Sequence, residues 1–158
     1  MNPRAIIAAA VASAGLVAGA TVATAGANDH ELRDVRTATA RFHSVTQAEQ
    51  AGYTVFADCF ESAEGGMGQH YVSNTLLNDQ GAVEATTPEA LVYEVRGDQL
   101  KLVSVEYIVW QADVSGPPSL FGQPFHEFGP FYVLHAWVWR DNLAGTFADW
   151  NRDVLPCP

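Results

Sequence analysis

The nine-residue run from Phe131 to Trp139 constrains the fold of this chain more than any other stretch. It is rich in β-branched and aromatic residues, which favour a β-strand. Successive side chains of a strand point to opposite faces, so the residues divide into two sets. One face carries Phe131, Val133, His135, Trp137 and Trp139, and the other carries Tyr132, Leu134, Ala136 and Val138. Both faces are apolar, and we therefore expect a central strand that is covered on both sides.

Further strands are predicted at 53–56, 69–73, 90–95 and 100–110, from the same enrichment in β-branched and aromatic residues. The segment Arg96-Gly97-Asp98-Gln99 is a turn that joins two of these strands into a hairpin. Consecutive strands that follow helices are typical of an α+β domain. We expect an N-terminal helical pair packed on an antiparallel sheet, which is strongly curved or closed into a small barrel.

The helical pair is predicted over residues 29–52, with a junction near His43. Asn28 or Asp29 can cap the first helix, and Ser44 with Gln47 fits a capping box at the start of the second. Gly52 is a natural C-terminal stop. The apolar stripe of the first helix is formed by Leu32, Val35, Thr39 and Phe42.

Residues 1–27 have the layout of a secretory signal peptide. Arg4 is followed by a charge-free run over residues 5–22, and small residues fit cleavage after Ala25 or Ala27. Retention as a membrane anchor is the alternative, but alanine is a weak membrane residue. We expect export by the Sec route, a secreted single α+β domain over residues 28–158, and no stable membrane insertion after cleavage.

The charge of the chain excludes some partners. Without the leader, seven Lys/Arg face eighteen Asp/Glu, which gives a net charge of −11. Such a surface repels nucleic acid and anionic membranes and attracts cations. A small ligand or a metal ion is compatible with it, whereas the oligomeric state has no sequence signal.

The chain has two cysteines, Cys59 and Cys157. In an exported protein an even pair predicts a disulfide bond. A catalytic thiol is the alternative, but Cys59 has no flanking motif and Cys157 lies between two prolines at the end of the chain.

Three polar residues fall in or beside apolar strands: His70, Glu106 and His135. Burial of a charged or polar group without a partner is costly, so each of them needs one. Two imidazoles and a carboxylate can bind zinc and leave a fourth position open, or can hold a redox metal. A shared ion requires the two imidazoles to lie within about 8 Å of each other, because ligand bonds are near 2 Å.

The spacing of these residues is not diagnostic, since the chain has no H-E-x-x-H, H-x-H or C-x-x-C motif. A buried His–Glu hydrogen bond without metal remains an alternative. His126 lies in a predicted loop, from which it either approaches the strand ends as a further ligand or stays exposed. The glycines of Gly65–Gly68 predict a turn that leads to His70, and the pair Glu89 and Glu94 is expected on the surface.

Six motifs together resemble a family of small exported bacterial proteins catalogued as hypothetical, many of them from actinobacteria. The motifs are G-M-G-x-H-Y (66–71), P-E-A-L-V-Y-E (88–94), L-V-S-V-E-Y (102–107), L-F-G-x-P-F (120–125), L-H-A-W-V-W (134–139) and G-x-F-A-D-W-N (145–151). The resemblance extends from Leu32 to Cys157 and implies secretion and a shared fold. The first motif, with its later histidine strand, is also similar to small zinc-binding β-barrel proteins.

These observations predict a secreted protein that binds a metal ion, zinc above all, or a small ligand through His70, Glu106 and His135. Two alternatives remain. One is a secreted metal-dependent enzyme with Glu106 as general base. The other is a cell-envelope interaction protein in which the histidines are purely structural.

Overall fold

The computed structural model describes residues 24–158, with side chains from residue 28 onward. The predicted signal peptide therefore lies outside the described residues, apart from the backbone of its last four, and stays a prediction. Within the described part of the chain, no helix has both the length and the apolar character needed to cross a membrane.

The N-terminal helices follow the predicted apolar stripe. Helix α1 spans Thr24–Thr39, a 3-10 turn follows at Ala40–His43, and α2 spans Val45–Gln50. The stripe is buried, with exposed fractions of 8 % or less at each of its four positions: Leu32, Val35, Thr39 and Phe42. The predicted capping box at the start of α2 is wrong, because the Ser44 side chain makes no capping hydrogen bond with any described residue.

The strands form one seven-stranded sheet in the order β1-β3-β4-β5-β9-β8, with β2 paired to β3 beside this path. All of these pairings are antiparallel. The strands are β1 (Tyr53–Val55), β2 (Phe60–Ser62), β3 (Gly65–Ser73), β4 (Ala90–Arg96), β5 (Gln99–Trp110), β8 (His126–Phe128) and β9 (Phe131–Ala136). A short hairpin of β6 (Ser119–Leu120) and β7 (Gln123–Pro124), helix α3 (Asn74–Leu77) and a 3-10 turn (Gln111–Asp113) complete the described elements.

This arrangement confirms the α+β prediction and corrects its finer part. The sheet is neither closed nor strongly curled, since its edge strands β1 and β8 do not pair with each other in the described structure. Each of the two has only three residues. Closure requires staggered pairing between the end strands, and such short strands offer few hydrogen bonds for it.

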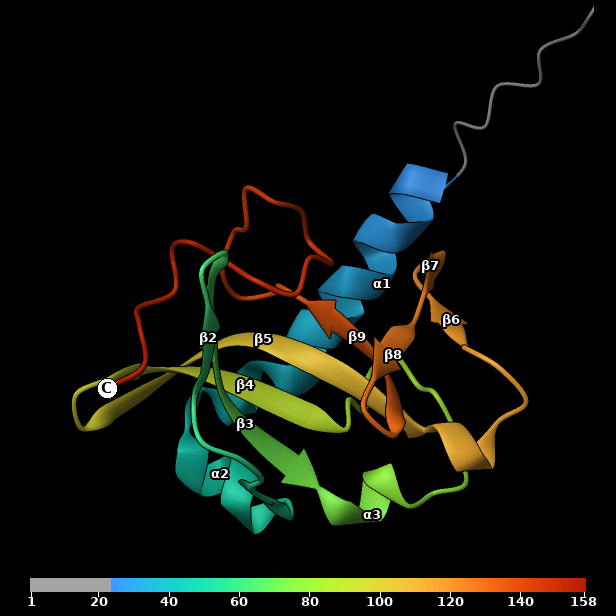
Figure 1. The fold of residues 1–158 in the computed structure, drawn as a ribbon, viewed down its shortest axis with the longest axis horizontal. Coiled ribbons are helices and arrows are strands. Elements are labelled where there is room, and N and C mark those ends of the chain that lie inside the picture. Colours follow the sequence, from blue (N-terminus) through green and yellow to red (C-terminus); the bar gives the residue numbers. More distant parts are fainter. Residues whose placement is uncertain (1–23) are drawn as a thin grey trace, which may run out of the picture.

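The N-terminal helices cover one face of the sheet (Figure 1), and β9 has buried residues on both of its faces, as the run at Phe131–Trp139 predicted. The larger core lies between the sheet and the N-terminal helices, where Val35 and Phe42 pack with the sheet residues Tyr93, Val105 and Leu134. The opposite face carries two smaller apolar clusters. Their buried members are Val72, Leu77, Ala90, Ile108 and Val133 in one, and Val103, Trp137 and Val154 in the other.

A register shift between β4 and β5 interrupts the alternation of faces that a regular strand would show along β5. Val92 pairs with Ser104 while Tyr93 pairs with Leu102, so Val103 is the extra residue of a β-bulge. Leu102 consequently packs in the helix-side core with Val105, whereas Val103 lies on the opposite side with Trp137.

The end of β9 also departs from the simple alternation. The strand ends at Ala136, three residues before the predicted end. Trp139 then lies on the helix side, where its indole Nε1 donates to Thr39 Oγ1 at 3.1 Å. The assignment of Trp139 to the face of His135 was therefore wrong, because the chain turns after the strand.

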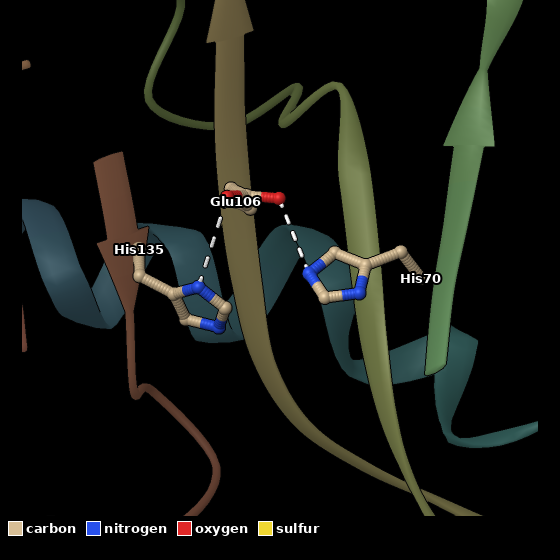
Figure 2. A group of neighbouring side chains, drawn as sticks. All are labelled: His70, Glu106 and His135. Carbon is tan, nitrogen blue, oxygen red and sulfur yellow. Dashed lines mark ion pairs between the residues drawn. The ribbon is translucent and has the colours of Figure 1, made fainter. Parts of the chain in front are cut away.

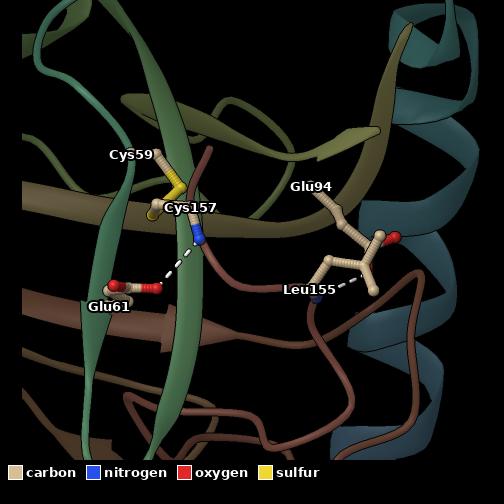
Figure 3. The surroundings of a disulfide bond; sticks show 5 residues. All are labelled: Cys59, Glu61, Glu94, Leu155 and Cys157. Atoms are coloured by element: carbon tan, nitrogen blue, oxygen red, sulfur yellow. Dashed lines mark hydrogen bonds between the residues drawn. A yellow bond between two sulfur atoms is a disulfide. The ribbon is translucent and has the colours of Figure 1, made fainter. Parts of the chain in front are cut away.

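The predicted disulfide is confirmed. Cys59 and Cys157 are bonded, with their Cα atoms 5.6 Å apart, and this bond fastens the C-terminal segment beside β2 (Figure 3). In the same segment the Cys157 backbone N–H donates to Glu61 Oε2, and the Leu155 N–H donates to Glu94 Oε1, each at 2.9 Å. The last residues are thus held both by the covalent bond and by two carboxylates.

Glu89 and Glu94 are buried, with exposed fractions of 2 % and 0 %, so the expectation that both lie on the surface was wrong. Glu94 accepts from Arg96 Nε at 2.5 Å and from Arg140 Nη1 at 3.4 Å, in addition to Leu155. Hydrogen bonds and opposite charges outweigh burial and hold the pKa of Glu94 below its ordinary value.

Candidate functional site

The strands bring His70, Glu106 and His135 onto the face opposite the helices. Glu106 on β5 pairs directly with His135 on β9, and on its other side with Ala90 on β4. His70 lies on β3, one strand further away, and its ring extends across β4 toward Glu106 (Figure 2). Ala90, directly beside Glu106, carries only a methyl group on this face and leaves room for the imidazole.

The glycines before His70 form part of β3 rather than the predicted turn. Gly68 has φ +113°, and a Cβ there would lie 2.6 Å from the carbonyl oxygen of Tyr93 on β4. Gly65 has φ +145°, and its Cβ would meet the backbone of Asn151 at 2.6 Å. These positions require glycine because other backbone segments pass against them. The close packing sets the position of β3, and with it that of His70.

The carboxylate of Glu106 lies between the two imidazoles. Its Oε2 is 3.2 Å from His70 Nε2, and its Oε1 is 3.9 Å from His135 Nδ1 (Figure 2). The ring centroids of the two histidines are 5.9 Å apart, well inside the 8 Å that a shared ion requires. The structure therefore brings together the three residues singled out from the sequence.

All three groups are removed from water, with exposed fractions of 4 % for His70, 7 % for Glu106 and 1 % for His135. The His135 ring stacks on Trp137 at a centroid distance of 4.9 Å, and Phe60 meets the His70 ring edge-on at 5.3 Å. These contacts restrict the rotation of both imidazoles. Phe60 and Trp137 therefore fix the direction in which each ring presents its nitrogens.

A hydrogen bond orients His135 further. Its Nε2 lies 2.8 Å from the hydroxyl oxygen of Ser104, a fully buried residue on β5. When His135 Nε2 donates to this oxygen, the lone pair of Nδ1 is directed toward Glu106. Sequence reasoning missed Ser104 as a partner, although it lies two residues before Glu106 and a strand places such residues on the same face.

Two ring nitrogens lack a partner. Among the described residues, His70 Nδ1 and His135 Nδ1 are the buried side-chain nitrogens or oxygens without a hydrogen bond. A buried polar atom that is left unsatisfied costs about 1–3 kcal/mol. His135 Nδ1 faces the carboxylate of Glu106 without a hydrogen bond to it. A cation bound between His135 and Glu106 would give this nitrogen a partner.

The burial of these groups sets their protonation. Burial lowers the pKa of His135 to about 4, although the Glu106 carboxylate opposes this shift. Burial alone would raise the pKa of Glu106, but the neighbouring histidines, His70 first and then His135 and His126, outweigh it and bring that pKa below its ordinary value. At neutral pH the cluster thus combines an ionised carboxylate with a neutral His135, the forms that ligate metals.

A pocket of about 80 Å³ opens beside the cluster. His70 and Glu106 contribute to its lining, and its other buried walls are apolar: Met67, Val72, Leu77, Ile108 and Val133. Phe56 and Phe128 also line it and are 55 % and 53 % exposed, which places them at the mouth.

His126 belongs to β8 and also lines this pocket. Its ring is 45 % exposed, and its Nε2 lies 3.3 Å from Asp149 Oδ2. Both expectations for His126 hold in part. The residue approaches the site, but it stays partly exposed and pairs with Asp149 outside the buried cluster. Sequence reasoning gave Asp149 no role, although it lies in the motif G-x-F-A-D-W-N, because it comes from a segment without regular strands.

The cluster has the dimensions to close on an ion. One ligand atom from each of His70, Glu106 and His135 can be chosen so that all three lie within 4.8 Å of one another. In a tetrahedral zinc site, with bonds near 2.0–2.2 Å, neighbouring ligand atoms are roughly 3.4 Å apart. Side-chain movements of about 1 Å would therefore bring the three groups to ligand distance.

Comparison with known proteins gave no match: no family model, no curated protein and no solved structure is significantly similar to this chain. The function must therefore be argued from the buried His–Glu–His cluster and the pocket beside it.

Proposed function

We propose that this protein binds a divalent metal ion, zinc in the first place, through His70 Nε2, a carboxylate oxygen of Glu106 and His135 Nδ1. The observation that carries this proposal is the convergence of three ligand-type side chains, from three strands, within 4.8 Å in a buried position. The orphaned Nδ1 of His135 supports it, because a bound ion would satisfy that atom.

Zinc agrees best with the chemistry of the donor set. Two imidazoles with one carboxylate are the ligand set of several zinc sites that keep a fourth position for water or substrate. The same three ligands with open positions also suit iron(II), which makes iron the second ion to test. His70 and Glu106 line the pocket whereas His135 does not, so the open position would face the pocket.

The surroundings of the cluster fit a metal site as well. Metal-bound imidazoles commonly donate their second N–H to an oxygen, which fixes the tautomer. Ser104 Oγ is in that position for His135 Nε2. The stacked Trp137 would keep the ring in place and exclude water from that side.

A metal-dependent enzyme is the second candidate, and the pocket favours it. When bound, zinc polarises a substrate oxygen or activates water. His126, oriented by Asp149 at the pocket mouth, is placed to hold or transfer a proton. As a metal ligand Glu106 would not be free to act as general base, so that role passes to His126.

The binding proposal can be tested by zinc titration calorimetry and metal analysis of protein purified without a histidine tag. We expect one zinc per chain in the wild type, and loss of at least 100-fold in affinity in His135→Ala and Glu106→Gln. The control His30→Ala removes a histidine on α1 whose side chain is 69 % exposed, and should bind zinc like the wild type. Iron(II) is titrated in parallel.

Unchanged zinc binding in His135→Ala would refute the proposal and leave the histidines with a structural role. Near-ultraviolet circular dichroism of each variant shows whether it is folded. If His135→Ala does not fold, Glu106→Gln, which is close to isosteric, provides the decisive comparison.

A further inference from the structure

In the pocket beside the cluster, polar groups lie at the buried end and at the mouth, and apolar walls lie between them. This arrangement indicates the class of ligand that the pocket can bind. Four of the described residues that line it carry titratable side chains, namely His70, Glu106, His126 and Asp149. The first two belong to the buried cluster and the last two to the mouth. The walls between them are hydrocarbon or aromatic, so a ligand with polar groups along its length would lose hydrogen bonds there.

The volume of the pocket limits the part of a ligand that it can enclose. A dry cavity of 150 Å³ holds benzene, with six carbon atoms. On that scale the observed 80 Å³ encloses about three or four heavy atoms. Anything larger must extend into the open mouth between Phe56 and Phe128, whose exposed rings offer an apolar surface.

The charge of the proposed zinc cluster determines which ligand head group the pocket would favour. In the zinc-bound cluster proposed above, two neutral imidazoles and one carboxylate would leave a net charge of about +1 around the ion. A monoanionic head complements that charge. Asp149, the other carboxylate near the pocket, already has His126 as its partner at 3.3 Å.

We infer that the pocket binds a small apolar monocarboxylate, with its carboxylate at the open zinc position above His70 and Glu106 and its tail between Phe56 and Phe128. A carboxylate has three heavy atoms, which the enclosed volume accommodates. The aliphatic or aryl tail then covers the two exposed phenylalanines. This inference rests on the proposed zinc site and adds the ligand class to it.

The aromatic pair at the mouth has a further implication. Removing an aromatic ring from water is favourable in free energy, and a half-exposed phenylalanine still has much surface that a ligand can cover. Phe56 follows β1 and Phe128 ends β8, at opposite edges of the sheet. Both rings nevertheless line this pocket, so a tail that leaves the enclosed volume can pack on either of them.

The experiment uses the full chain, first titrated with zinc so that the metal site is assessed independently. Zinc-loaded and zinc-free protein are then titrated by calorimetry with 3-phenylpropionate, hexanoate and 3-phenylpropylamine. The two acids compare an aryl with an aliphatic tail, and the amine keeps the aryl tail with the opposite charge. We expect both acids to bind zinc-loaded protein at least tenfold more tightly than zinc-free protein, and the amine to show no such gain.

Variants test the position of the tail. Phe128→Ala should weaken 3-phenylpropionate at least fivefold. The matched control Leu143→Ala removes an apolar side chain that is 96 % exposed and lies outside this pocket, and should bind the acid like the wild type. Zinc affinity is measured for each variant, so that an effect on the metal site is recognised.

The outcomes separate the two proposals. Failure of zinc binding in the first titration refutes the metal site itself. Zinc binding without acid binding, or acid binding that is equal with and without zinc, refutes the ligand class and leaves the metal site standing. Equal binding of acid and amine likewise refutes the charge argument. Unchanged affinity in Phe128→Ala refutes the placement of the tail.

Discussion

The hydroxyl oxygen of Ser104 lies 2.8 Å from Nε2 of His135, while Nδ1 of the same ring faces Glu106 at 3.9 Å. One buried imidazole is thus contacted on both nitrogens by side chains of a single strand, β5. Ser104 and Glu106 are two residues apart and share a face, so the strand period alone produces this arrangement. Ser104 therefore controls which nitrogen of His135 is available to a ligand.

We predict that Ser104→Ala lowers zinc affinity about 10–100-fold without abolishing binding, because loss of an outer partner relaxes the orientation of a metal-bound imidazole. Zinc titration calorimetry measures this change. Ser119→Ala, an exposed serine on β6, is the control and should match the wild type. Equal zinc affinity in Ser104→Ala and the wild type would show that the hydroxyl has no part in orienting the ring.

The fold class and the members of the cluster were readable from the sequence for a common reason. Strands that are apolar on both faces have few polar residues, so His135 and Glu106 stood out within them. Strand alternation then placed His135 on one face of its strand. His70 was found through its position after the glycines, although those glycines belong to β3 itself and not to a turn.

The errors arise where long-range contacts override local pattern. The bulge at Val103 is created by pairing between β4 and β5, and no residue within β5 announces it. Glu94 shares a strand face with the apolar Ala90 and Val92, so a signal for its burial was present. Of its compensating partners, Arg96 is only two residues away, but Arg140 and Leu155 are 46 and 61 residues away, and sequence proximity could not reveal those two.

Glu89 should make stability depend on pH. Burial raises its pKa from 4.5 to about 8, with further contributions from the charges of Asp79 and Glu106, while the Ile108 N–H that donates to Glu89 Oε2 opposes the shift. The folded state therefore holds a proton that the unfolded chain releases near pH 4.5. Stability is fully present below pH 4.5 and decreases as pH rises toward 8, by about 1.4 kcal/mol per unit.

Glu89→Gln keeps an oxygen acceptor for Ile108 and removes the ionisation. We predict that the variant and the wild type have similar free energies of unfolding near pH 5, and that the variant becomes progressively the more stable toward pH 8. Urea denaturation at several pH values measures the difference. Glu84→Gln, at an exposed position, is the control and should follow the wild type. Parallel profiles for Glu89→Gln and the wild type would contradict the prediction.

Two glycines with positive φ allow the effect of close strand packing to be separated from that of backbone strain. Gly68 lies where β3 and β4 approach closely, and Gly97 does not. Gly97, in the hairpin turn, has φ +59° and nothing within 4 Å of an added Cβ, so Gly97→Ala should cost about 1–2 kcal/mol of backbone strain. Gly68 has φ +113° and a Cβ there would lie 2.6 Å from Tyr93 O. Gly68→Ala should therefore cost at least about 2 kcal/mol more, since the strands must separate as well.

The same separation would displace His70, which lies two residues after Gly68 on β3. We therefore expect folded Gly68→Ala protein to bind zinc at least tenfold more weakly, whereas Gly97→Ala should bind like the wild type. Urea denaturation measures the two stabilities, and zinc titration the two affinities. Equal destabilisation by the two substitutions would mean that β3 accommodates the added methyl group. Full zinc affinity in Gly68→Ala would mean that the position of His70 does not depend on the packing of Gly68 against Tyr93.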